Sequence, residues 1–139
     1  MGPPVVDWGL PLKAVTMAQK LSSRQQAQLA FLQMLPPKFQ RLHTVIEEMA
    51  ALRADDVAVR GLARQLDEMR AQAQALNLSR VADTAGLMGM MARRTGGVQV
   101  RVRGLREQLG SLKLNYEAAL KNATTPEADA EAETAPGPD

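Results

Sequence analysis

The sequence contains no cysteine, one histidine and few aromatic residues. Of its 139 residues, two are Phe, one is Tyr and one is Trp. Without cysteine, neither a disulfide framework nor a thiolate metal site can form, which fits a reducing compartment. One histidine without cysteine cannot supply a usual transition-metal ligand set. We therefore expect no metal site and no cofactor.

Long apolar runs are also lacking. No stretch approaches the roughly 20 apolar residues that a membrane-spanning helix needs, and the N-terminus lacks the basic-then-apolar layout of a signal peptide. The sequence offers neither a nucleophile with an adjacent base nor a glycine-rich phosphate loop. These absences predict a cytoplasmic protein without membrane insertion and without enzymatic activity. The length gives room for one domain.

Apolar residues recur at helical spacing in four segments, in steps of three and four that place each series on one helix face. The series are Phe31, Leu35, Phe39, Leu42, Ile46 and Met49; Val59, Leu62, Leu66, Met69, Ala73 and Leu76; Val81, Ala85 (or Thr84), Met88 and Met91; and Val98, Val102, Leu105, Leu109, Leu112, Tyr116 and Leu120. Residues 98–103 alternate as in a strand, but the helical series that contains them is longer. The pattern predicts an all-α, antiparallel up-and-down four-helix bundle.

Capping residues and prolines predict where these helices begin and end. Ser22-Ser23 suits an N-cap, and Pro36-Pro37 requires either a kink or a fresh helix that starts there. The other expected boundaries are a start at Asp55 or Asp56, a stop at Asn77, a cap at Ser79 and a break at Gly96-Gly97.

Charge and composition divide the chain into three parts. All 17 Lys and Arg precede residue 123, whereas five of the 15 acids follow it, so the body is basic despite a net charge of only +2. Residues 123–139 combine Pro, Ala and acids without large apolar side chains, which predicts a disordered acidic tail. Its role is solubility or a lid that screens the basic body. We expect an N-terminal arm at 1–21, the bundle at 22–122 and the tail at 123–139.

The second expected helix ends in the sequence LDEMRAQAQALNL, residues 66–78. It resembles the signature helix of histidine-containing phosphotransfer domains, the family that includes the P1 domain of chemotaxis kinases, which has the form A-H-T-L-K-G-S-A-G-x-L-G-L. In this register Met69 and Ala73 fill apolar positions, Arg70 matches the lysine, Ala71 replaces the first glycine, and Leu76-Asn77-Leu78 matches Leu-Gly-Leu. Asp67 stands where the phosphorylated histidine would be.

The resemblance implies a phosphotransfer fold that has lost phosphotransfer, because a carboxylate replaces the nucleophilic imidazole. The family's docking face for receiver domains would remain. We expect Ala63, Asp67, Arg70 and Gln74 to form an exposed stripe, with Ala71 small enough for close approach of a partner. Asp67 could imitate the charge of a phosphorylated site, or could simply pair with Arg70 along an ordinary exposed face.

Three other features bear on function. The only histidine, His43, is the alternative candidate for phosphorylation, because it precedes a threonine as in the signature. Glu47, however, stands where a basic group is needed to bind the phosphate. On the third helix, Leu87 and Met90 lie off the apolar series among small residues, and could contact a partner or a second copy. Around Gly96-Gly97 lies a basic cluster, formed by Arg93, Arg94, Arg101, Arg103 and Arg106.

These observations lead to two functional expectations. The first is a small, bacterial-type signalling adaptor of a two-component system that binds a receiver domain, or another signalling protein, without catalysis. An acidic protein surface would also suit the basic cluster. The second is a helical oligomerisation or nucleic-acid-associated protein that uses the methionine-rich and arginine-rich faces. Nucleic acid is the less favoured partner because no aromatic stacking platform accompanies the arginines.

Overall fold

In the computed structural model, residues 21–127 are described, and they form five helical segments. These are α2 (Ser23–Gln33), α3 (Leu35–Ala50), α4 (Asp56–Ala75), α5 (Ser79–Arg93) and α6 (Val98–Ala123). No strand occurs among residues 21–127, so the predicted all-α class is confirmed. Residues 1–20 of the expected arm and 128–139 of the expected acidic tail lie outside the described residues.

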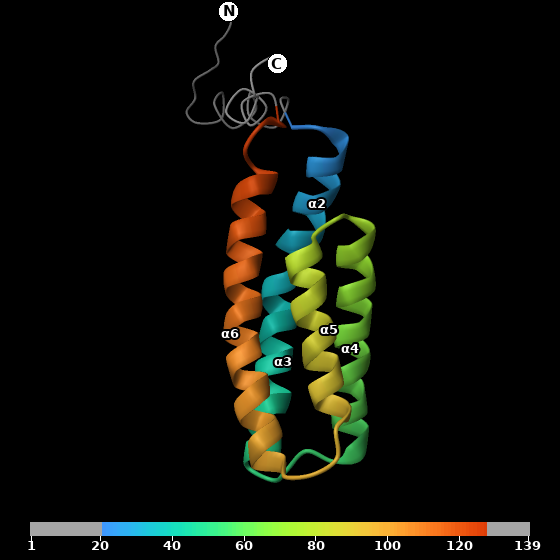
Figure 1. Cartoon of the computed structure of the whole chain (residues 1–139), viewed down its shortest axis with the longest axis vertical. Helices are drawn as coiled ribbons and strands as arrows, with labels where there is room; N and C mark the ends of the chain where they lie inside the picture. The colour runs from blue at the N-terminus through green and yellow to red at the C-terminus, as the bar shows by residue number, and fades with distance from the viewer. Residues whose placement is uncertain (1–20, 128–139) are drawn as a thin grey trace, which may run out of the picture.

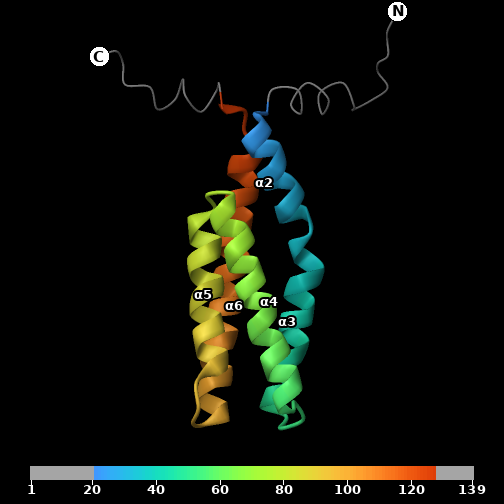
Figure 2. The same cartoon turned by 90° about the vertical axis from the view of Figure 1, so that its right-hand side faces the viewer.

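The helices form an antiparallel up-and-down bundle, as predicted (Figure 1). Segments α2 and α3 together occupy the position of the first helix of the bundle. Helices α4, α5 and α6 follow with alternating direction. The most extensive packing is between α4 and α5, followed by α5 with α6 and α6 with α3. Figure 2 shows that α2 and the end of α6 extend beyond the α4–α5 hairpin. Within residues 21–127, no helix combines the length and the hydropathy needed to cross a bilayer.

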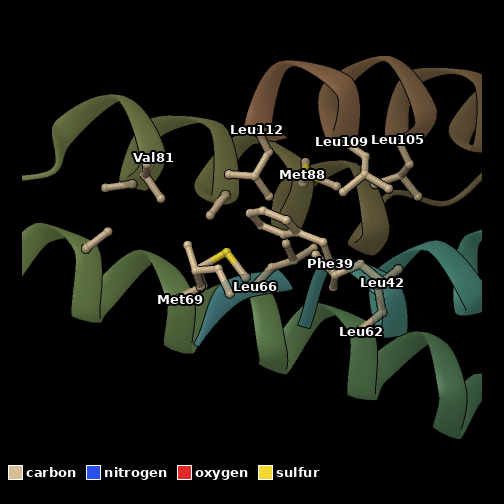
Figure 3. Packing of buried hydrophobic residues seen from close by; sticks show 14 of the residues in the cluster. Phe39, Leu42, Leu62, Leu66, Met69, Val81, Met88, Leu105, Leu109 and Leu112 are labelled. Carbon is tan, nitrogen blue, oxygen red and sulfur yellow. The ribbon is translucent and has the colours of Figure 1, made fainter. Parts of the chain in front are cut away.

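Side chains from all four helices of the bundle, with α2 and α3 taken as one, meet in one apolar core (Figure 3). The four series predicted from the sequence are confirmed, because each member is buried or packs partly buried against the core. The rings of Phe39 and Tyr116 meet edge to face, with centroids 5.4 Å apart and planes at 88°. Seven further hydrophobic residues among those described are buried without having been assigned to a series: Leu21, Leu32, Ala63, Leu78, Ala82, Ala92 and Ala123.

The break between α2 and α3 follows from the two prolines. Pro36 and Pro37 lie in the first turn of α3, where the missing amide hydrogens have no intrahelical acceptor to lose. The prolines therefore start a fresh helix instead of kinking one. At the other end of α2, Ser22 is the N-cap: its hydroxyl accepts from the Gln25 amide, and the Gln25 side chain accepts from the Ser22 amide.

The α4–α5 turn depends on Asn77, which adopts a left-handed conformation with φ of 61°. The amide of Leu78 donates to the carbonyl of Ala73, which closes a Schellman motif at the end of α4. The expected cap at Ser79 is wrong. Leu78 already closes α4 and also serves as N-cap of α5, so Ser79 falls inside the first turn without a side-chain capping bond.

A second left-handed residue, Leu52, ends α3 with φ of 60°. The amide of Arg53 donates to the carbonyl of Glu48, as in the same capping motif. A leucine in this conformation is strained because its Cβ crowds the backbone, and 74% of its surface is exposed, so burial does not offset the strain.

We predict that Leu52→Gly raises the free energy of unfolding by about 0.5–1 kcal/mol, since relief of left-handed strain exceeds the added entropy of the unfolded chain. Urea denaturation of both proteins measures the change. Leu52→Ala is the control: it removes the exposed side chain but keeps the strain. An equal gain in both variants would show that the exposed side chain, not the backbone, is responsible.

The two ends of the described chain are joined by Gln25, which is only 4% exposed. Its side-chain amide donates to the carbonyls of Asn122, at 3.0 Å, and Thr125. Ala123 is fully buried, and Glu127 pairs with Arg24 at 2.8 Å. Residues 123–127, which the sequence analysis placed in the tail, thus pack on the bundle, because small and polar side chains can be held by hydrogen bonds without a large apolar anchor.

Gln25→Ala should lower the free energy of unfolding by about 1–3 kcal/mol, because it removes the amide that satisfies two carbonyls at a largely buried position. Gln33→Ala, at an exposed position of the same helix, is the matched control and should change stability by less than about 0.5 kcal/mol. Urea denaturation measures both values. Equal effects would mean that the contact with the end of α6 contributes nothing specific.

Candidate functional site

The site begins with an ion pair between α4 and α5. The guanidinium of Arg93 is bidentate on the carboxylate of Asp67: Nη1 lies 3.2 Å from Oδ1, and Nη2 contacts Oδ2. Arg93 Nη1 also donates to the carbonyl of Gly89. The hydrogen bond to Asp67 is the main reason that the pKa of Arg93 is raised. Asp67 therefore does not pair with Arg70 as the sequence suggested, because α5 brings a closer cation.

Small residues on α5 allow this close approach. A Cβ on Gly89 would lie 3.3 Å from both Asp67 Oδ1 and Arg93 Nη1, and a Cβ on Gly86 would lie 2.9 Å from Cδ of Arg70. The aliphatic stem of Arg70 thus covers the backbone of α5 at Gly86. These two glycines, which lie inside a helix where they are otherwise unfavourable, make room for side chains of α4.

Beside the ion pair lies a groove of about 510 Å³, at the end of the bundle where α4 begins and α5 ends. We call it the basic groove. Its charged lining residues are Arg60, Arg64 and Arg93, Arg94 and Arg101, with Asp56 and Asp67. Ala63 and Ala92, both buried, line it too. The lining therefore has five cations and two anions, which gives this surface a positive potential.

Arg101 connects α6 to the end of α5. Its Nη1 donates to the carbonyl of Ala92 at 3.2 Å, which satisfies one of the last carbonyls of α5 and places a cation at the negative end of that helix. The Nε atom of Arg101 is enclosed and has no hydrogen-bond partner among residues 21–127.

Several of the groove arginines have no carboxylate partner among the described residues. Arg60, Arg64, Arg94 and Arg101 form no ion pair within residues 21–127. Sequence reasoning missed Arg60 and Arg64. The available signal was their spacing of four residues, which places them on one face of α4 and in step with Asp67. The same groove also borders a smaller hollow of about 380 Å³, with which it shares Arg94 and Arg101.

The structure separates the expected stripe on α4. Ala63 is only 4% exposed, so its expected exposure is wrong: the close approach of α5 covers it. Asp67, Arg70, Ala71 and Gln74 are exposed, but of these only Asp67 lines the groove. The other three lie further along α4, toward the α4–α5 turn.

Leu87 and Met90 point outward on α5, with 38% and 59% of their surfaces exposed. Neither lines the basic groove. The expected basic cluster is also divided: Arg93, Arg94 and Arg101 line the groove, whereas Arg103 and Arg106 do not. His43 is exposed on α3 and does not line the basic groove.

Arg106 is held by α3 instead. Its Nε and Nη2 atoms donate to the two oxygens of Glu47, at 2.8 and 2.7 Å. The hydrogen bond from Arg106 is the main reason that the pKa of Glu47 lies below its usual value of 4.5. This bidentate pair links α3 to α6 on the outside of the core.

A depressed pKa means that the Glu47 carboxylate stabilises the fold above pH 4.5 and that this contribution is lost as the pH falls below 4.5 through the lowered pKa. We expect Glu47→Gln to unfold at a lower urea concentration than wild type at neutral pH, and the difference to shrink and then vanish as the pH falls below 4.5 and through the lowered pKa. Glu48→Gln, which alters a neighbouring carboxylate without an ion pair among the described residues, is the control. A difference that persists at acidic pH would indicate packing, not charge.

The lining of the basic groove suits the binding of anions. Among residues 21–127, no three His, Asp or Glu side chains come together as a metal site. The groove's polar lining consists of guanidinium groups and two carboxylates, which can hold anions through paired hydrogen bonds. Such a groove can recognise negative charge and planar acceptors.

Comparison of the chain with protein-family models, with curated proteins and with solved structures gave no match.

Proposed function

We propose that the protein is a non-catalytic binding module that holds an acidic surface of a partner protein in the basic groove. The observation that carries the proposal is the convergence of guanidinium groups from α4, α6 and the end of α5 on one groove. In this role the protein is a small cytoplasmic signalling adaptor of bacterial type.

The electrostatics support an acidic partner. Arginine binds carboxylates through two parallel hydrogen bonds and is less strongly hydrated than lysine. Four groove arginines have no carboxylate partner within residues 21–127, so a partner's acids would not have to displace existing ion pairs. Complementary charge of this kind speeds association and selects partners.

A receiver domain is the first candidate for this partner. The groove lies along α4, the helix that resembles the phosphotransfer signature, and receiver domains present an acidic metal-binding pocket. Asp67 has a different role from the one the resemblance suggests, because Arg93 already neutralises its charge. It positions Arg93 at the groove instead of imitating a phosphorylated side chain.

We predict that Arg60→Glu/Arg64→Glu weakens binding of purified receiver domains from the same organism at least tenfold, because two attractive charges become repulsive. Isothermal titration at about 50 mM salt measures the dissociation constants, and affinity should fall as salt rises. The control is Lys113→Glu/Lys121→Glu, which makes the same change of charge at two exposed positions of α6 outside the groove. Equal losses in both variants would show that only net charge matters, and the groove would have no role.

The second candidate is nucleic acid, which arginine side chains also suit. The large exposed apolar residues of the described chain include no aromatic side chain for base stacking. A duplex DNA titrated under the same conditions separates the two candidates, since phosphate binding weakens steeply with salt. Tight, steeply salt-dependent binding of DNA without binding of any receiver domain would favour this alternative.

The oligomerisation alternative uses a different surface. Association through Leu87 and Met90 would bury apolar area and would persist at high salt. Sedimentation of wild type and Met90→Lys at about 500 mM salt tests it, with self-association of wild type alone as the supporting result.

A further inference from the structure

The chain carries its own acidic segment as well as the basic groove. Beyond the described residues, Asp129, Glu131 and Glu133 alternate with alanines. The groove arginines Arg60 and Arg64 have no ion-pair partner within residues 21–127. The acidic segment and the arginines of the groove have opposite charges and therefore attract each other.

The spacing of the two charge sets is compatible. Arg60 and Arg64 are one helical turn apart, so their Cβ atoms lie about 6 Å from each other on one face. Acids two residues apart lie on the same side of an extended backbone, at intervals of about 6.6–6.8 Å. An extended segment with acids at 129, 131 and 133 can therefore place successive carboxylates against successive arginines along α4.

The segment of the same chain is too short to reach the far edge of this groove. Glu127 is fixed on Arg24 at one end of the bundle, whereas Arg101 lies in the first turn of α6 at the other end (Figure 1). From Arg101 to Ala123 the helix rises about 33 Å, at 1.5 Å per residue. Arg60 is also distant: α4 rises about 24 Å from Arg60 to Leu76, whose carbonyl accepts from Gln28, one turn beyond Arg24 in α2. Glu133 lies six residues beyond Glu127, which spans at most about 21 Å when fully extended.

We propose that the basic groove binds the acidic segment 129–133 of a second copy of this chain. Two copies that lie antiparallel would each place a segment in the other's groove, so the contact is mutual and closes as a two-fold dimer. This inference rests on the proposed function, because the segment would occupy the same groove and be displaced by a more acidic partner. The dimer would be weak and salt-dependent, as expected for ion pairs near a surface.

Sedimentation velocity of the full chain tests the proposal, at about 50 mM salt and over a range of concentrations. Wild type and Lys113→Glu/Lys121→Glu should form dimers. Dimer affinity should fall at least tenfold in Arg60→Glu/Arg64→Glu, which loses the groove, and in Asp129→Asn/Glu131→Gln/Glu133→Gln, which loses the segment. A mixture of these two variants should recover association, because one copy retains the groove and the other retains the segment.

A synthetic peptide of residues 126–139 provides the second measurement. It should bind the full chain that carries the neutralised segment and should not bind Arg60→Glu/Arg64→Glu. Binding of the peptide to the neutralised chain, with wild type monomeric and closed to the peptide, would show that each chain covers its own groove and would overturn the proposal. So would a dimer that survives neutralisation of the segment.

The inference is also overturned if wild type does not dimerise and the peptide does not bind the chain that carries the neutralised segment. Receiver-domain binding that depends on Arg60 and Arg64 would still support the proposed function in that case. The two failures are thus distinguishable.

Discussion

The close contact between α4 and α5 determines most of the shape and charge of the basic groove. Gly86 and Gly89 leave room for the side chains of Arg70 and Asp67, and the short turn at Asn77 brings the two helices together. The contact covers Ala63, draws Arg93 onto Asp67 and aligns the arginines of α4 with those at the end of α5. A wider separation would leave two unrelated helix faces in place of one groove.

The fold could be predicted largely from the sequence, because burial of one helix face makes apolar residues recur in steps of three and four. Phe39, Leu66 and Leu105 all lie where this period places them. The boundaries were less accessible. Ser79 has the chemistry of a cap, yet the geometry of the preceding Schellman motif assigns the cap position to Leu78. The short connection between α4 and α5, and not the capping preference of serine, therefore determines where α5 begins.

The site was predictable only in part, because charge partners depend on which helices are neighbours. Asp67 has Arg70 nearby in sequence, but its partner in space is Arg93, 26 residues away. Arg106 belongs to the basic cluster by sequence and is bound by Glu47 of α3 in the fold. Periodicity identifies the face on which a side chain lies, and only the tertiary arrangement identifies what it meets there.

The four passes of the chain and the bond between Gln25 and Asn122 bring residues 21 and 127 to the same pole of the bundle (Figure 2). The basic groove lies near the opposite pole. Because residues 21 and 127 lie close together, a short peptide could join them and new termini could be opened in an interhelical loop, so the bundle of residues 21–127 is suited to circular permutation.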